Sequence, residues 1–210
     1  GRTKWVFDLG QNMVGRIRLN VKGPAGATLT IRHAEILNSD GTIYTTNLRT
    51  AKQTDHYTLR GGGWEVYEPH FTFHGFRYVE ISGGPAEMTF TRASVTGIVL
   101  YSNIPMTGRF ECSEPLLNQF YRNVQWGHRG NFLDIPTDCP QRDERLGWTG
   151  DAQVFVRAAT FNGDVAGFFT KWQIDLADAQ SPRGAIPPTV PTTDSVGEGD
   201  GGPAWAEAAG

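Results

Sequence analysis

The chain has few of the features that mark disulfide-rich, nucleic-acid-binding or membrane proteins. It has two cysteines, Cys112 and Cys139, which are too few for a disulfide framework and lack a zinc-type spacing. The formal net charge is −3, so the sequence lacks the positive patch that nucleic acid or an anionic membrane surface attracts. No apolar run is long enough to cross a bilayer. We therefore expect no nucleic-acid partner, no membrane partner, no metal and no cofactor.

Aromatic and turn-forming residues are abundant instead. The 210 residues include 12 Phe, 6 Trp, 26 Gly and 12 Pro. Aromatic rings fill hydrophobic cores, and they also offer flat faces to the C–H side of a sugar ring. Residues 203–210 read as a helix that starts and then stops, and no signal peptide precedes the first strand-like residues. We therefore expect a piece of a longer protein, and the sequence indicates neither compartment nor oligomeric state.

The first half of the chain has the two-residue period of β-strands. Residues 15–21 alternate, with Ile17, Leu19 and Val21 on one face. Turns rich in glycine and proline separate such segments. The strands that we expect are 6–9, 15–21, 28–32, 54–59, 76–81 and 88–100, with a last one at 108–112. Many short strands of this kind predict an antiparallel β-sandwich, jelly-roll-like, for residues 1–103.

From residue 104 to residue 210 the period becomes helical. A first helix is expected over 114–130, with Ser113 as its N-cap. A second, strongly apolar helix is expected over 152–161 and should be buried, and Asp164 should cap a third. The third helix has an apolar stripe of Val165, Phe168, Phe169, Trp172 and Leu176. Successive helices without intervening strands indicate a helical array and not a βαβ fold.

The five histidines do not form a recognisable metal spacing. His70 and His74 lie four residues apart in a strand-like, aromatic stretch, where we expect packed or hydrogen-bonded side chains. Phe71, Phe73, Phe76 and Tyr78 alternate in the same stretch, and we expect them to belong to the core and not to a carbohydrate-binding face. His128 falls at the end of the first expected helix, where a cation would suit the helix dipole, and we interpret it as structural.

The loop at residues 137–151 is the most unusual segment. It combines four carboxylates and two guanidinium groups with Leu146 and Trp148, between two apolar helices. A solvated loop of mutually neutralising charges is one interpretation. The interleaved apolar residues favour a second one, in which the loop is partly buried and carries chemistry.

Glycosidic bond cleavage needs carboxyl groups in different environments. One must stay protonated near neutral pH to donate a proton to the leaving oxygen, and others stay ionised and bind hydroxyls. A tryptophan supplies a face for the sugar ring. The loop offers these groups in Asp138, Asp143, Glu144, Trp148 and Asp151. Chemistry alone does not assign a role to each carboxyl.

The run DCPQRDERLGWTGD at 138–151 resembles the catalytic signature of the bacterial α-L-rhamnosidases of glycoside hydrolase family 78. Four upstream segments resemble the β domain that precedes the helical barrel in that family. These segments are 7–15, 32–35, 44–52 and 71–78. The resemblance covers essentially the whole chain, with several motifs in the family's order.

The resemblance implies an inverting hydrolase with a β-sandwich followed by the first helices of an (α/α)6 barrel. The substrate would be a terminal non-reducing α-L-rhamnose of a rhamnose-containing glycoside or oligosaccharide. The family's general acid falls on Glu144, and its general base lies beyond this chain. The substrate-binding positions fall on Asp138, Trp148, Asp151 and Trp205, and an acidic position after the last of these falls on Glu207.

Two interpretations from other functional classes stay open at this point. The chain could be a non-catalytic carbohydrate-binding module, with its binding residues in 1–103, or a structural fragment that is inactive because it is incomplete. Within the enzymes, a glycosidase for another deoxy-sugar or a hexuronide on the same barrel is an alternative. Rhamnose binding by residues 1–103 alone would favour the binding module.

Overall fold

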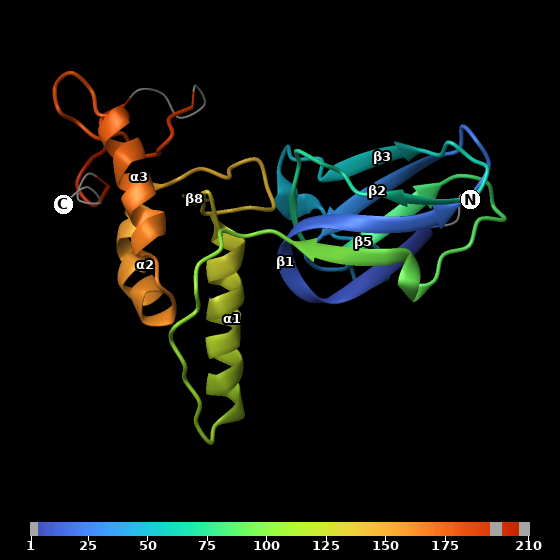
Figure 1. The fold of residues 1–210 in the computed structure, drawn as a ribbon, viewed down its shortest axis with the longest axis horizontal. Coiled ribbons are helices and arrows are strands. Elements are labelled where there is room, and N and C mark those ends of the chain that lie inside the picture. Colours follow the sequence, from blue (N-terminus) through green and yellow to red (C-terminus); the bar gives the residue numbers. More distant parts are fainter. Residues whose placement is uncertain (1–3, 194–198, 206–210) are drawn as a thin grey trace. The chain divides into compact units, whose positions relative to one another are not determined.

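The computed structural model describes residues 4–193 and 199–205, which fall into two compact units. The first unit comprises Gly1–Leu100 together with Pro140–Asp143, and the second comprises Tyr101–Cys139 together with Glu144–Gly210. Glu207 lies outside the described residues. The fold class predicted from the sequence, an antiparallel β domain followed by helices, is confirmed (Figure 1).

The first unit, called the β unit below, is built on one six-stranded antiparallel sheet. Its strands are β1 (Lys4–Lys22), β2 (Thr28–Ala34), β3 (Thr54–Thr58), β4 (Trp64–Tyr67), β5 (His74–Gly83) and β6 (Val95–Val99). The order is β3-β2-β5-β1-β4, and β6 also pairs with β1. Two short 3₁₀ turns, Thr46–Leu48 and Arg92–Ser94, lie in the connections.

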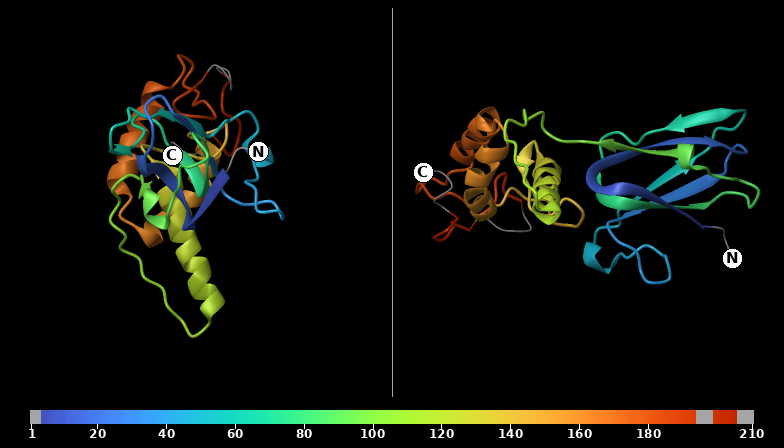
Figure 2. Two further views of the ribbon diagram at one scale, coloured as in Figure 1. Left: turned by 90° about the vertical axis from the view of Figure 1, so that its right-hand side faces the viewer. Right: turned by 90° about the horizontal axis from the view of Figure 1, so that it is seen from below.

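Strand β1 pairs with three other strands of the sheet. Its first part pairs with β5, and the register shifts between Asp8 and Met13. Its second part pairs with β4 and β6. The bulge and the positive φ of Gly10 let the strand bend, and Figure 2 shows β1 in blue curling at one end of the sheet. The two strands expected at 6–9 and 15–21 are therefore one.

The alternating residues of the strands form the core of the first unit. Ile17, Leu19, Ile31 and Phe76 are fully buried, as the period predicts. The expectation for Phe71 was wrong, because its side chain is fully exposed. Phe71 precedes β5 and has a φ of 62°, so it is not part of the alternating pattern.

Three other differences between the expected and the observed strands concern β4, β6 and residues 108–112. Strand β4 was not expected, because Trp64 and Val66 are exposed and give the segment no buried alternation of large residues. The segment expected at 88–100 begins with turns and narrows to β6. Residues 108–112 are not a strand in the structure.

The second unit, called the helical unit below, contains the three expected helices, α1 (Pro115–Asn131), α2 (Thr149–Asn162) and α3 (Ala166–Asp178). A small hairpin of β7 (Phe132–Leu133) and β8 (Ile135–Pro136) lies between α1 and α2 in the sequence. The N-cap of α1 is Glu114 and not Ser113, because the Glu114 carboxylate accepts the Leu116 N–H at 3.0 Å.

The buried side chains of helices α2 and α3 pack together in two clusters. Ala159 and Val165 pack with Phe132, and Ala152 packs with Trp172 and Leu176 of the predicted stripe. The expectation that α2 is buried holds for one face only, since Ala152 and Ala159 are buried but Val154 and Phe161 are 81% and 70% exposed. None of the helices within the described ranges is both long and apolar enough to span a membrane.

Candidate active site

The loop at residues 137–151, called the signature loop below, is divided between the two compact units. Its residues Pro140–Asp143 pack within the β unit. Asp143 accepts a hydrogen bond from the Thr50 N–H at 3.2 Å and another from the Thr50 hydroxyl, and these bonds lower the pKa of Asp143. A Cβ on Gly75 would lie 2.8 Å from the Cβ of Gln141. The β unit therefore holds the middle of the loop by close contact.

Asp138 fixes the path of the loop in the helical unit. Its carboxylate accepts the N–H of Leu146 at 3.2 Å, and both residues are half-buried. The interpretation of the loop as a wholly solvated set of charges does not fit this burial. Part of the hydrogen-bonding capacity of Asp138 is used within the protein, so its role includes positioning as well as any contact with a ligand.

The second half of the loop pairs with the segment that follows α3. The Val190 N–H donates to the Gly147 carbonyl at 2.8 Å, and Trp148 forms a β-bridge with Thr189. A Cβ on Gly147 would collide with the Val190 carbonyl, so only glycine permits this approach. The Trp148 indole N–H is buried and has no hydrogen-bond partner among the described residues.

The Glu144 side chain lies close to those of Asp138 and Cys139. A carboxylate oxygen of Glu144, a carboxylate oxygen of Asp138 and the Cys139 sulfur lie within 4.8 Å of one another, and all three residues are half-buried. Cys139 forms no disulfide within the described residues. The Glu144 side chain is therefore near Asp138 and does not project into open solvent.

A pocket of about 610 Å³ in the helical unit brings three predicted residues together. Asp138, Asp151 and Trp205 line it. Glu144 and Trp148 are not among its lining residues. The volume falls in the range of small-molecule sites. The pocket thus combines two carboxylates with one aromatic face.

Trp205 reaches the pocket because of a glycine at the start of α2. A Cβ on Gly150 would lie 3.0 Å from atoms of the Trp205 indole. The glycine lets the ring lie against the first turn of the helix, next to Asp151, while 38% of the tryptophan stays exposed. A sugar ring in the pocket could therefore contact both an aromatic face and a carboxyl group.

Asp151 is the carboxyl of the signature whose pKa is raised. The first cause is partial burial, and the second is the negative charge of Asp138. Its position in the first turn of α2 acts in the opposite direction, because a helix N-terminus favours negative charge. Asp151 therefore keeps its proton to a higher pH than a free aspartate, and in that form it can donate a hydrogen bond.

The interpretation of His128 as a cation at the end of a helix was wrong. Its residue surface is 2% exposed, and burial followed by the charge of Arg129 lowers its pKa. The ring packs edge-to-face on Phe132 and Phe155, with centroids 4.3 and 5.8 Å away. A neutral imidazole with this packing belongs to the wall of the pocket, which it lines.

The sequence interpretation missed this α1 wall of the pocket. Its members are Val124, Gly127, His128 and Asn131. They are spaced as i, i+3, i+4 and i+7, so they share one face of α1. The helical period was visible in the sequence, but the mixture of small, polar and apolar residues on this face did not mark it as a pocket wall.

Comparison with protein-family models gives two matches that together span almost the whole chain. Residues 1–101 match the bacterial alpha-L-rhamnosidase concanavalin-like domain. Residues 105–209 match the bacterial alpha-L-rhamnosidase 6 hairpin glycosidase domain.

Individual relatives agree with the family models. The chain is 54% identical over 204 residues to an alpha-L-rhamnosidase of Streptomyces avermitilis. This alignment covers 97% of this chain and 19% of the relative. It is 52% identical to an alpha-L-rhamnosidase of Formosa agariphila, covering 89% of this chain and 20% of the relative. The chain therefore spans about a fifth of the length of these relatives.

Solved structures share the fold. The crystal structure of the Streptomyces avermitilis alpha-L-rhamnosidase complexed with L-rhamnose superposes with a TM-score of 0.92 at 53% identity, over 98% of this chain and 20% of that chain. The chain belongs to the bacterial α-L-rhamnosidase family.

Proposed function

We propose that the protein carrying this chain hydrolyses terminal non-reducing α-L-rhamnose from rhamnose-containing glycosides or oligosaccharides. The observation that carries the proposal is the pocket in which Asp138, Asp151 and Trp205 meet, in a chain of this family. The relative from Streptomyces avermitilis was crystallised with L-rhamnose, which supports a deoxy-sugar as the ligand.

The pocket suits a monosaccharide with one apolar face. Carboxylate oxygens accept hydrogen bonds from sugar hydroxyls, and Asp151 in its protonated form can also donate one. Trp205 offers its ring to the C–H groups of the sugar. The α1 wall adds the apolar side chain of Val124 to the lining of the pocket.

We assign Glu144 as the general acid of an inverting reaction. Its carboxyl donates a proton to the departing glycosidic oxygen, while a water attacks the opposite face of the anomeric carbon. Inverting sites hold the acid and the base about 6.5–9.5 Å apart to admit that water. The base belongs to a part of the protein beyond these 210 residues. The position of the Glu144 carboxylate supports this role, because it lies within 4.8 Å of a carboxylate oxygen of Asp138, which lines the pocket.

Replacing Glu144 by glutamine in the full-length protein tests the assignment. Loss of a general acid reduces turnover by about 10²–10⁴-fold. We expect a large loss of kcat on alkyl rhamnosides and a smaller loss on aryl rhamnosides with an activated leaving group, which need less protonation. Glu87→Gln, an exposed glutamate of the β unit, is the matched control and should keep wild-type kinetics.

Equal losses on both substrate types would remove Glu144 from the acid role. A loss of turnover in Asp151→Asn that shows this leaving-group dependence, with Glu144→Gln unaffected, would move the role to Asp151. The stereochemistry is tested separately by proton NMR, in which the first sugar released should be the β-anomer.

A further inference from the structure

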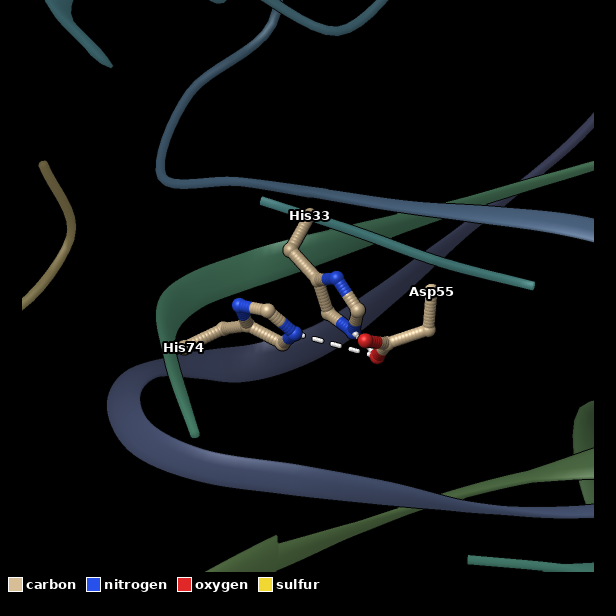
Figure 3. Close-up of side chains that lie close together, drawn as sticks. All are labelled: His33, Asp55 and His74. Atoms are coloured by element: carbon tan, nitrogen blue, oxygen red, sulfur yellow. Dashed lines mark hydrogen bonds and ion pairs between the residues drawn. The ribbon is translucent and has the colours of Figure 1, made fainter. Parts of the chain in front are cut away.

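Three titratable side chains of the β unit converge in a place that the proposed hydrolysis does not use. His33 lies on β2, Asp55 on β3 and His74 on β5, which are neighbouring strands in the order β3-β2-β5 (Figure 3). His74 Nε2 is 3.0 Å and His33 Nε2 is 4.0 Å from Asp55 Oδ2. The three side chains are 0%, 11% and 7% exposed, in the order His33, Asp55, His74. The two imidazole rings stack with their centroids 4.1 Å apart.

The orientation of Gln53 determines which nitrogen of His74 carries a proton. The Gln53 side-chain NH₂ donates to the Gly75 carbonyl at 2.9 Å, so the amide cannot be turned round without placing two oxygens against each other. Its Oε1 therefore faces His74 Nδ1 at 2.8 Å and accepts a hydrogen bond from it. His74 Nδ1 is protonated, and its Nε2 is the nitrogen that points at Asp55.

His33 is held in the same tautomer. Its Nδ1 lies 3.0 Å from the main-chain carbonyl of Gln53, which can only accept, so this nitrogen also carries a proton. Burial, followed by the charge of His74, lowers the pKa of His33 to about 3, so the ring is neutral near pH 7. Its Nε2 is then a lone pair, and this buried atom has no hydrogen-bond partner among the described residues.

Two imidazole Nε2 atoms and a carboxylate therefore share one small space. In their neutral form both rings would direct lone pairs at a group that is itself an acceptor, and burial makes such an arrangement unfavourable unless a positive charge lies between them. Histidines that bind a metal through one nitrogen usually donate the other N–H to a carbonyl or carboxylate, which fixes the ring. Here Gln53 supplies an acceptor to each ring, one from its backbone and one from its side chain.

We propose that His33 Nε2, His74 Nε2 and the Asp55 carboxylate bind one divalent transition metal, Zn²⁺ in the first instance. The three ligand atoms lie within 4.8 Å of one another, which is compatible with a tetrahedral ion at about 2.0–2.2 Å from each. A water completes the coordination on the partly open side of Asp55. Two nitrogen donors select zinc-like ions over calcium or magnesium, which prefer oxygen. The ion would link the three neighbouring strands β3, β2 and β5 through one ligand from each.

Zinc binding by the full-length protein tests the site. After removal of bound metal with a chelator, Zn²⁺ is titrated in competition with 4-(2-pyridylazo)resorcinol, and the stoichiometry, affinity and shift in Tm are measured. We expect one equivalent to be bound by the wild type and to raise the Tm. His33→Gln and Asp55→Asn should each lower the affinity for that Zn²⁺ ion by about 100-fold or more. His56→Gln removes an exposed imidazole next to Asp55 on the same strand and should bind as the wild type does.

Cobalt separates this site from weak binding elsewhere. Co²⁺ bound by two imidazoles and a carboxylate in a tetrahedral site gives visible absorption bands, which should appear in the wild type and His56→Gln and be absent from Asp55→Asn. Asp55→Asn is nearly isosteric, so circular dichroism should show it folded. If the wild type binds no equivalent, or if both variants keep it, the proposal is overturned and a proton shared by His74 and Asp55 replaces the metal. The result is independent of glycosidase activity.

Discussion

At the scale of single residues, the site separates three carboxyl groups by their surroundings. Asp143 is held ionised by Thr50, Asp138 accepts a backbone N–H of the loop, and Asp151 has a raised pKa. The pKa values of Asp143 and Asp151 therefore shift in opposite directions because their neighbours differ. The sequence motif named these carboxyls, but only the contacts assign an environment to each.

The raised pKa of Asp151 predicts a definite pH dependence of stability. The folded protein binds its proton more tightly than the unfolded chain, whose aspartates titrate near 3.8. The stability from this group is therefore fully present below pH 3.8 and is lost as the pH rises through the higher folded pKa. We expect Asp151→Asn to gain stability relative to the wild type as the pH rises from about 4 to 7.

The measurement is the Tm of the wild type and of Asp151→Asn across this pH range. Asp178→Asn, at the exposed end of α3, is the control and should show no such divergence. A difference between wild type and Asp151→Asn that is constant with pH, or that grows toward acid, would contradict the burial and charge effects described for this group.

At the scale of elements, glycines permit the contacts that shape the loop. Gly75 at the start of β5 admits Gln141, and Gly150 in the first turn of α2 admits Trp205. Neither has a positive φ, so their requirement is for space and not for backbone freedom. These contacts join segments that lie far apart in the sequence.

We expect Gly75→Ala to destabilise the full-length protein by about 1–3 kcal/mol, as overpacking does, because the new methyl meets both Cα and Cβ of Gln141. Turnover should fall as well, since the displaced segment leads directly into Glu144. Gly63→Ala adds a methyl where nothing lies within 4 Å, so it is the matched control. Urea unfolding followed by tryptophan fluorescence gives the free energies. Equal stability of the two variants would show that the loop is not held at Gly75.

The period of the sequence predicted most elements, and the exceptions have physical reasons. Helix α1 and the buried face of α3 follow directly from apolar spacing. Strand β4 escaped prediction because pairing with β1 alone defines it, while its large residues face solvent. The buried His128 was misread because its burial depends on Phe132 and Phe155, which pack on it from outside its own helix.

At the scale of the whole molecule, helix α1 exposes large apolar side chains on one face. Leu116 and Phe120, four residues apart on α1, are 77% and 64% exposed. Such surfaces bind other protein surfaces or cause aggregation. Because the chain spans about a fifth of its relatives' length, we expect the rest of the barrel to cover this face.

This predicts that one double substitution on α1 has opposite effects in the isolated 210-residue chain and in the full-length protein. Leu116→Ser with Phe120→Ser should increase the soluble yield of the isolated 210-residue chain, because it removes an apolar patch. The same pair should destabilise the full-length protein by about 3–6 kcal/mol, because each side chain would then leave a buried contact. Gln119→Ser on the same helix should have little effect in either. An unchanged full-length protein would show that the face stays exposed.

The sequence by itself determined the family and the order of a β domain and helices, because these depend on local period and on residues that are contiguous in the chain. Only the tertiary structure brought Trp205 against Gly150, attached Asp143 to Thr50, and placed His33, Asp55 and His74 together. Each of these arrangements joins residues from different elements. Their distances depend on strand pairing and side-chain packing, which no short-range pattern records.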